Sequence, residues 1–280
     1  MRLPRRDEVK DPWQVRWCRE DDVRCHFNPN ARKSSVFGYR LRFDALLSLI
    51  RSRVPKGGRV LEYGPAQGNF ALTLAEEGYR VTAVDLQQGF LDYARLKYEK
   101  GEVEFLCGNF MDFSRPGAFD AVLCGEIIEH VAYPRDLLRS AWRNLKPGGI
   151  VALSTPNGAE EGSPLPTFSQ VKDPSAFIPR QFHWGDHVFL YTREELESLG
   201  DECGFSTFHS EAMDSRQQNR LKAVRYLMPL SWLHALEKWG RTRPIKGRAS
   251  TRLLIHGYRK EARTPGDVPD RVLGRGPGAV

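Results

Sequence analysis

The stretch Val60-Leu-Glu-Tyr-Gly-Pro-Ala-Gln-Gly-Asn-Phe70 decides the fold expected for this 280-residue chain. Its apolar start predicts a short buried strand, and residues 69–77 predict a helix that ends at Gly78. Gly64 and Gly68 fall in the connecting turn, where the backbone must approach a ligand closely or adopt a positive φ angle. A strand, a tight turn and a helix in this order are typical of a nucleotide-binding edge of a parallel sheet, although the glycines do not form GxGxxG.

Seven short apolar stretches predict strands, and the segments between them predict amphipathic helices. The expected strands are 59–63, 80–84, 103–107, 119–124, 150–154, 205–209 and 253–258; the expected helices are 39–53, 69–77, 89–98, 135–145 and 192–203. This alternation predicts an α/β fold with a doubly wound, mostly parallel seven-stranded sheet that has helices on both faces. Thr192 and Glu195 have the spacing of a capping box at the start of the last helix.

Composition divides the chain into one main domain with flanking and inserted segments. Residues 1–38 predict an irregular N-terminal cap, 39–260 the α/β domain, and 261–280 a disordered tail rich in Pro and Gly. Two insertions, about 156–190 and 210–250, interrupt the alternation. The first is long enough to form a lid or a binding segment.

The formal net charge is +7, and ten Lys and Arg between residues 216 and 252 accompany a single acid, Glu237. Trp232 and Trp239 lie among these basic residues. The stretch predicts either a solvated helical surface or a surface for an anionic partner, such as nucleic acid, a phosphorylated substrate or a membrane. Five cysteines without a CxxC pair, no secretory leader and no membrane-spanning apolar stretch predict a cytoplasmic protein.

Polar residues follow the next two expected strands. Asp85 ends the second strand, where its carboxylate can accept hydrogen bonds from ribose hydroxyls. The third strand leads into Gly108, Asn109 and Phe110. A glycine turn combined with an acid at the end of the following strand is far more specific than the turn alone. The sequence therefore predicts a nucleoside-binding site at the carboxyl edge of the sheet.

From about residue 39 to residue 258 the sequence resembles the class I S-adenosylmethionine (SAM)-dependent methyltransferases. The resemblance rests on an E-x-G-x-x-x-G signature and later segments: Glu62, Gly64, Gly68, Asp85, 119–122 and 145–149. It implies a Rossmann-like methyltransferase fold in which the glycine turn faces the methionine part of SAM and Asp85 holds the ribose. It also implies adenine contacts from Asn109 and the Phe110 backbone, although an acid is commoner in the family at the position of Asn109.

The segment Cys124-Gly-Glu-Ile-Ile-Glu-His-Val131 follows the fourth expected strand and carries two carboxylates and an imidazole. If a helix begins near Glu126, then Glu126, Glu129 and His130 share one face. At the carboxyl edge of the sheet they would form an oxygen-rich site for a divalent metal. Residues 186–187, downstream of the long loop, could supply a fourth ligand.

This segment resembles two groups of methyltransferases. The O-methyltransferases of ubiquinone biosynthesis have a similar E-x-x-E-H turn and a later His. The small-RNA 2′-O-methyltransferases have E-x-x-E-H and a later D-H-x-F-x-x-T-R, which residues 186–193 match here. This likeness implies that Mg²⁺ or Mn²⁺ would be held by Glu126, Glu129, His130 and His187. The metal would bind the acceptor hydroxyls and lower their pKa.

The same segment is compatible with a site that holds no metal. Glu126 and Glu129 would then cap a helix or contact SAM, and a general base would come from His130, His187 or His183. Phe182-His-Trp184 equally fits an aromatic wall of the acceptor pocket.

These patterns favour SAM-dependent methyl transfer, by in-line displacement, to a hydroxyl of a small metabolite, sugar or glycolipid. One alternative is RNA 2′-O-methylation, which the D-H-x-F match and the basic stretch favour, although the sequence has no separate RNA-binding module. Another is a SAM-binding scaffold without catalysis, against which the complete set of Glu62, Gly64, Gly68 and Asp85 argues.

Overall fold

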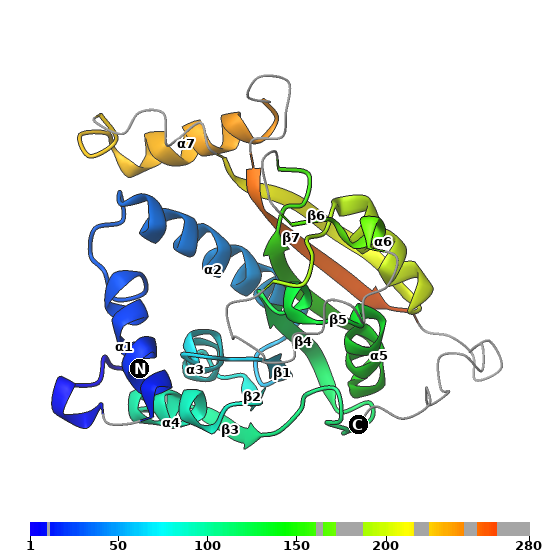
Figure 1. Cartoon of the computed structure of the whole chain (residues 1–280). Helices are drawn as coiled ribbons and strands as arrows, with labels where there is room; N and C mark the ends of the chain where they lie inside the picture. The colour runs from blue at the N-terminus through cyan, green and yellow to red at the C-terminus, as the bar shows by residue number, and fades with distance from the viewer. Residues whose placement is uncertain (10–11, 161–164, 172–186, 216–223, 244–250, 262–280) are drawn as a thin grey trace.

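A computed structural model of the chain describes residues 1–9, 12–160, 165–171, 187–215, 224–243 and 251–261. Seven strands form one sheet in the order β3-β2-β1-β4-β5-β7-β6, and helices flank it on both sides (Figure 1). The strands are β1 (Arg59–Tyr63), β2 (Arg80–Asp85), β3 (Glu102–Cys107), β4 (Phe119–Gly125), β5 (Leu145–Pro156), β6 (Phe205–Ser215) and β7 (Thr251–Lys260). The doubly wound, mostly parallel sheet expected from the sequence is therefore confirmed.

The first five strands pair in parallel, whereas β7 runs antiparallel to both β5 and β6. The strand order reverses at β1, because β2 lies on one side of it and β4 on the other. In a doubly wound sheet such a reversal leaves a crevice beyond the carboxyl ends of the two strands. The site is therefore expected beyond β1 and β4.

Helices bury both faces of the sheet in two separate apolar clusters. On one face α2 (Ser34–Arg53) and α3 (Asn69–Glu76) pack on the strands. On the other, α5 (Pro134–Asn144) and α6 (Arg193–Glu202) do the same. The capping box is confirmed, since the Thr192 hydroxyl accepts from the Glu195 amide and the Glu195 carboxylate accepts from the Thr192 amide.

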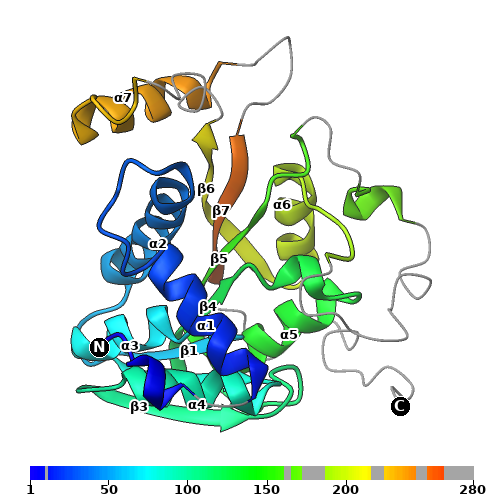
Figure 2. The same cartoon turned by 60° about the vertical axis from the view of Figure 1, so that its left-hand side comes forward.

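The N-terminal segment is helical, so the prediction of an irregular cap over residues 1–38 was wrong. It contains a 3₁₀ turn, η1 (Arg6–Glu8), and the helix α1 (Trp13–Arg24), and α2 already begins at Ser34. The buried face of α1 is Val15, Cys18 and Asp22. A carboxylate at one of these positions interrupts the apolar period that would have indicated a helix. Figure 2 shows α1 crossing the side of the molecule formed by α3 and α4 (Gln88–Lys97).

The insertion between β6 and β7 contains the helix α7 (Leu230–Arg241), which packs on β6. The expected tail, apart from residue 261, lies outside the described residues. So do residues 161–164 and 172–186 of the first insertion, whose described part includes η3 (Phe168–Gln170). Among the helices that are described, none combines the length and the apolar character needed to span a bilayer.

Candidate functional site

A cavity of about 620 Å³ lies beyond the carboxyl ends of β1, β2 and β4. Gly64, Leu86 and Glu126, which line it, come from the loops or ends of these three strands. The reversal of strand order at β1 leaves this space free of a crossing connection. The cavity is therefore where the topology predicts a ligand site.

The turn after β1 depends on two glycines in left-handed conformations. Gly64 has a φ of +62° and Gly68 a φ of +72°. A Cβ atom on Gly64 would lie 2.3 Å from Cδ1 of Ile127, and one on Gly68 would lie 2.7 Å from Cβ of Ala94. Gly64 lines the cavity, whereas Gly68 is the residue before α3 and packs against α4. In one turn, Gly64 thus forms part of the cavity wall, whereas Gly68 allows close packing against α4.

Asp85 is held rigidly at the edge of the cavity by two backbone amides. Its Oδ1 accepts from the Gln87 amide at 2.9 Å and its Oδ2 from the Ala66 amide at 3.2 Å. Burial raises the pKa of Asp85, and these two hydrogen bonds oppose that shift. Each oxygen keeps a further lone pair, so the carboxylate can accept from two neighbouring hydroxyls.

Glu62 does not line the cavity. It is buried in β1, and its carboxylate accepts a hydrogen bond from the Ala71 amide in α3. Burial, together with the nearby Asp85 carboxylate, raises the pKa of Glu62 to about 8. Its Oε2 atom has no hydrogen-bond partner among the described residues. The position ties β1 to the helix that follows the turn.

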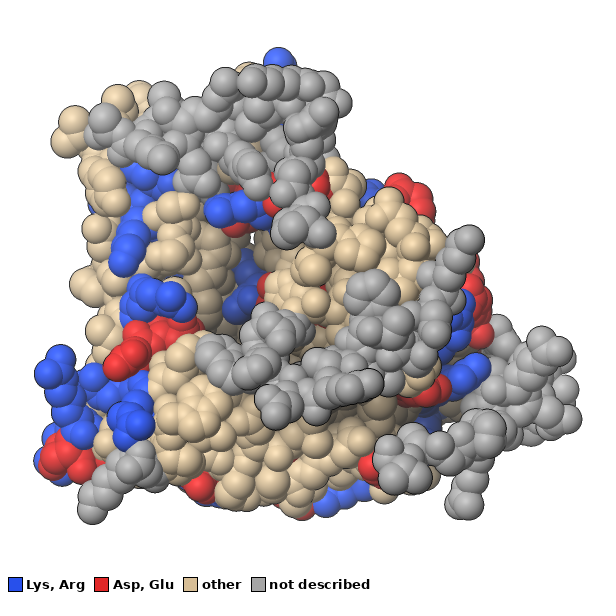
Figure 3. Space-filling model, in the orientation of Figure 1, with Lys and Arg blue, Asp and Glu red and all other residues tan. Residues whose placement is uncertain are grey.

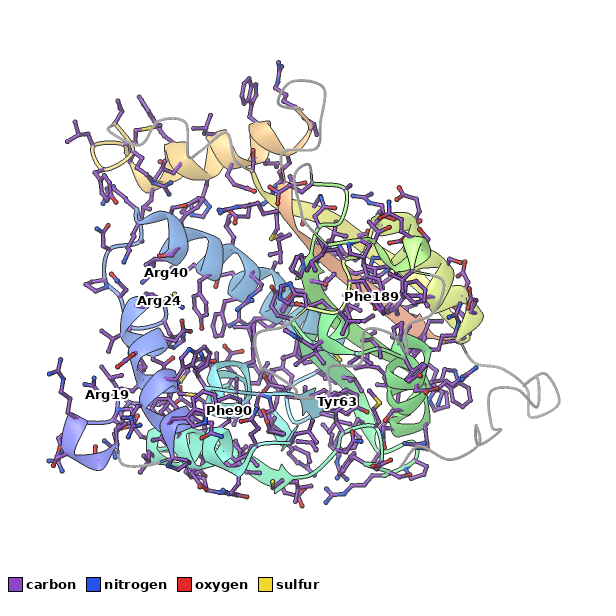
Figure 4. The ribbon with its side chains drawn as sticks, viewed as in Figure 1. Arg19, Arg24, Arg40, Tyr63, Phe90 and Phe189 are labelled. Atoms are coloured by element: carbon purple, nitrogen blue, oxygen red, sulfur yellow. The ribbon has the colours of Figure 1, made fainter. Side chains whose placement is uncertain are left out.

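A third wall of the cavity comes from the loop after β3. Asn109 lines it, and its Oδ1 accepts from the Met111 amide at 3.0 Å, which folds the loop back on itself. Phe110 also lines it and stacks on Tyr63, with ring centroids 4.9 Å apart. In Figure 4 Tyr63 lies on β1, and Phe90, a residue of α4, lies to its left. Asn109 and Phe110 thus line the same cavity as Asp85.

The helices α1 and α2 complete the cavity. Trp17 and Asp21 of α1, with Tyr39 and Arg42 of α2, line it. Gln67 Nε2 donates to Asp21 Oδ2 at 2.8 Å, which links α1 to the glycine turn. The signal in the sequence was the presence of Trp13, Trp17 and Phe27 in this otherwise polar segment, since a solvated segment has little use for large aromatic side chains.

A fully buried ion pair fastens α1 to this end of the cavity. Lys97 Nζ lies 2.6 Å from Asp22 Oδ2, and neither side chain is exposed. Asp22 also accepts from the Tyr93 hydroxyl and from Asn69 Nδ2, both at 2.8 Å. Lys97 donates to the Gln67 carbonyl at 3.1 Å and to Asn69 Oδ1. Burial lowers the pKa of Lys97, and Asp22 offsets that shift.

At the other end of the cavity, Glu126 is not part of a helix. It has a φ of +57°, and the 3₁₀ turn η2 (Ile128–His130) begins two residues later. The prediction that Glu126, Glu129 and His130 share one face of a helix is therefore wrong. Instead, Glu126 accepts from the Ser154 hydroxyl at 2.8 Å and lies 3.4 Å from an Arg42 guanidinium nitrogen.

Glu129, His130 and His187 form a cluster, in which one ligand atom from each lies within 4.8 Å of the others. The two imidazole rings have centroids 4.8 Å apart and both line the cavity. The Val188 amide donates to the Glu129 carbonyl at 2.7 Å, and this bond brings the segment after the long loop beside η2. Glu126 is not in this cluster, and His183 lies outside the described residues.

The Glu129 carboxylate is only half satisfied. Its Oε2 accepts from the Thr155 hydroxyl at 3.0 Å, but the buried Oε1 has no partner among the described residues. Burial raises the pKa of Glu129 well above its usual range, and the neighbouring Glu126 carboxylate adds to the shift. An unpartnered oxygen beside two imidazoles is a donor set that fits a small divalent cation.

Comparison with known proteins agrees with this geometry. The model of a family described as a methyltransferase domain matches residues 38–210. A ubiquinone biosynthesis O-methyltransferase of Thiobacillus denitrificans is 32% identical over 166 residues, which cover 58% of this chain and 70% of the relative. The one from Xanthomonas axonopodis pv. citri is 39% identical over 107 residues, covering 37% and 45%. The chain spans about half the length of the first curated relatives it matches.

Solved structures share the fold at low sequence identity. The [4+2]-cyclase SpnF has a TM-score of 0.55 at 21% identity, covering 84% of this chain and 86% of its own. Phosphoethanolamine N-methyltransferase 2 of Haemonchus contortus, solved with SAM, has a TM-score of 0.53 at 19% identity, covering 86% and 59%. Sheet order, cavity and family match agree, and the chain belongs to the methyltransferase domain family, with the fold of the class I SAM-dependent methyltransferases.

Proposed function

We propose that the chain transfers a methyl group from SAM to a hydroxyl of a small hydroxylated metabolite, such as a phenol, a sugar or a glycolipid headgroup. The observation that carries the proposal is one cavity with Asp85 at one end and His130 and His187 at the other. The names of the ubiquinone biosynthesis O-methyltransferase relatives support oxygen as the acceptor atom.

The Asp85 end suits the donor. The two amide hydrogen bonds fix the carboxylate, so its free lone pairs are directed before a ribose arrives. A side chain at Gly64 would push against Ile127, which also lines the cavity, so the glycine keeps this wall in place for the methionine part. The sulfonium of SAM is already activated for methyl transfer. The remaining tasks of the protein are to align donor and acceptor and to take the acceptor proton.

The opposite end suits a divalent cation held by Glu129, His130 and His187. Two imidazoles and one carboxylate are a poor set for Mg²⁺, which prefers oxygen ligands, and a better one for Mn²⁺. Such a cation would supply a Lewis acid that lowers the pKa of an acceptor hydroxyl. Glu126 contributes to the wall of the acceptor pocket through its contacts with Arg42 and Ser154.

The test is methyl transfer followed by product mass spectrometry. The full chain is incubated with SAM and a panel of phenols, catechols, sugars and short RNAs, with Mn²⁺, with Mg²⁺ or with EDTA. We expect a methylated small molecule, formed fastest with Mn²⁺ and suppressed by EDTA. A product confined to RNA, or none, would contradict the proposed function. Full activity in EDTA would show that the reaction needs no cation, and His130 or His187 would then act as the general base.

A matched pair of variants tests the ligand set. Glu129→Gln keeps the shape of the side chain but removes the charge, so we expect at least about a 100-fold loss of Mn²⁺-dependent turnover. Glu126 lies outside the cluster. The Glu126→Gln variant should therefore bind Mn²⁺ with an affinity within about threefold of the unmodified protein. Calorimetric titration with Mn²⁺ gives both affinities. Equal losses in the two variants would restore a four-ligand site and refute the three-residue site.

A further inference from the structure

One surface of the molecule carries large apolar side chains that nothing described covers. Leu227 is 85% exposed, Trp232 is 64% exposed and Trp239 is 49% exposed. Trp232 and Trp239 are seven residues apart in α7, which places them two turns apart on the same face of the helix. Clustered exposed apolar side chains of this size mark interaction sites more often than solvated surface.

The adjacent face of α7 fixes the helix to the domain. Leu233 packs in the core beside α2 and β6, and Glu237 is buried. The Asp214 amide donates to Glu237 at 2.9 Å, and Arg241 pairs with the same carboxylate at 2.7 Å. Ahead of the helix, Arg32 donates to the Met228 carbonyl at 2.8 Å. The two tryptophans are therefore carried by a helix that is firmly anchored to the domain.

The charges on this surface have one sign. Between residues 224 and 243 the exposed charged side chains are Lys238 and Arg243, and the acid, Glu237, is buried and paired. The Arg243 guanidinium lies 4.4 Å from the centroid of the Trp239 ring. In Figure 3 the charged side chains at the upper left, beneath α7 and along α2, are mainly Lys and Arg.

Tryptophan and a long basic side chain have a shared preference for the boundary between lipid and water. The indole and the methylene stem enter the apolar layer while the polar tip remains at the headgroups. Basic residues near the membrane surface add attraction to anionic lipids. A nucleic acid would satisfy the cations and the rings, but it offers no apolar layer in which Leu227 could be buried.

We propose that α7 and the segment before it dock the protein on an anionic membrane surface. The docking surface consists of Leu227, Trp232, Lys238, Trp239 and Arg243. It lies on the insertion between β6 and β7, apart from the residues that line the cavity. Binding to lipid is thus separable from methyl transfer in solution.

Sedimentation of the full chain with vesicles tests this proposal. The vesicles contain phosphatidylcholine alone or phosphatidylcholine with about one third phosphatidylglycerol. We expect at least tenfold tighter binding to the anionic vesicles, weakened by salt because part of the attraction is electrostatic. Trp232→Ala combined with Trp239→Ala should reduce that binding at least tenfold, and Lys238→Glu should reduce it severalfold.

Two control variants isolate the surface. Tyr98→Ala removes an exposed aromatic residue at the end of α4, and Lys100→Glu reverses an exposed charge two residues later. The helix α4 lies far from α7 in Figure 1. Both variants should bind vesicles like the unmodified protein. Thermal unfolding and SAM affinity verify that every variant is folded. Absence of vesicle binding, equal binding by the tryptophan variant, or binding of short RNA in place of vesicles would overturn the proposal.

Discussion

The two ends of the cavity are built on opposite principles. At the donor end both oxygens of Asp85 are engaged by backbone amides before any ligand arrives. At the acceptor end Glu129 is buried with one oxygen unpartnered among the described residues, close enough to Glu126 for their charges to interact. For the proposed function, the comparison means that the backbone already arranges the donor end, whereas the acceptor end would be completed by the cation or substrate that binds there.

The largest expected effect tests the rigidity of the donor end. Lys97→Met leaves Asp22 charged, buried and without its cation, and this should lower the free energy of unfolding by about 3–5 kcal/mol. Adding Asp22→Leu removes the stranded charge and should restore a large part of the loss. Urea unfolding of the single and double variants measures both values. A double variant no more stable than Lys97→Met would show that the ion pair does not act as a unit.

A smaller effect separates steric crowding from backbone strain at two glycines on either side of β1. Gly64 and Gly57 both have positive φ angles, but only at Gly64 would a Cβ atom meet a neighbour within 4 Å. Gly57→Ala should therefore lower the unfolding free energy by only about 1–2 kcal/mol and leave SAM affinity unchanged. Gly64→Ala should cost more and should also weaken SAM binding at least tenfold. Calorimetry and thermal unfolding provide the two readouts, and identical behaviour would contradict the close-approach role of Gly64.

The smallest effect concerns the scaffold outside both ends. His256 is fully buried between the Thr207 and Ser210 hydroxyls, and burial lowers its pKa from 6.5 to about 3. The unfolded chain therefore binds a proton at a higher pH than the folded chain does. The stabilisation is complete above pH 6.5 and falls by at most about 1.4 kcal/mol per unit as the pH drops toward 3.

His256→Gln should accordingly unfold more easily at pH 7 but show a shallower loss of stability between pH 6 and pH 4. Denaturant unfolding at several pH values measures this slope. His26, whose pKa burial lowers to about 4, contributes the same kind of acid sensitivity and remains in the variant. A slope unchanged by the substitution would place the acid sensitivity elsewhere in the chain.

The same comparison explains what the sequence could predict. Gly64 and Asp85 occupy fixed places after consecutive parallel strands, so their encounter follows from topology alone. The acceptor end depends on one backbone bond, from the Val188 amide to the Glu129 carbonyl, which local spacing does not reveal. Local spacing also does not reveal that Glu126 has a φ of +57°, which is incompatible with the helix expected there. The covering helix α1 escaped prediction because Asp22 stands where an apolar residue was expected.

One measurement tests the division into donor and acceptor ends most directly: the affinity for SAM of Asp85→Ala beside that of Glu129→Gln, by calorimetry without added metal. Loss of hydrogen bonds to a charged group at Asp85 should weaken SAM binding about 100-fold. Glu129→Gln should bind SAM within about threefold of the unmodified protein. A full loss of affinity in Glu129→Gln, or an unchanged affinity in Asp85→Ala, would contradict the account.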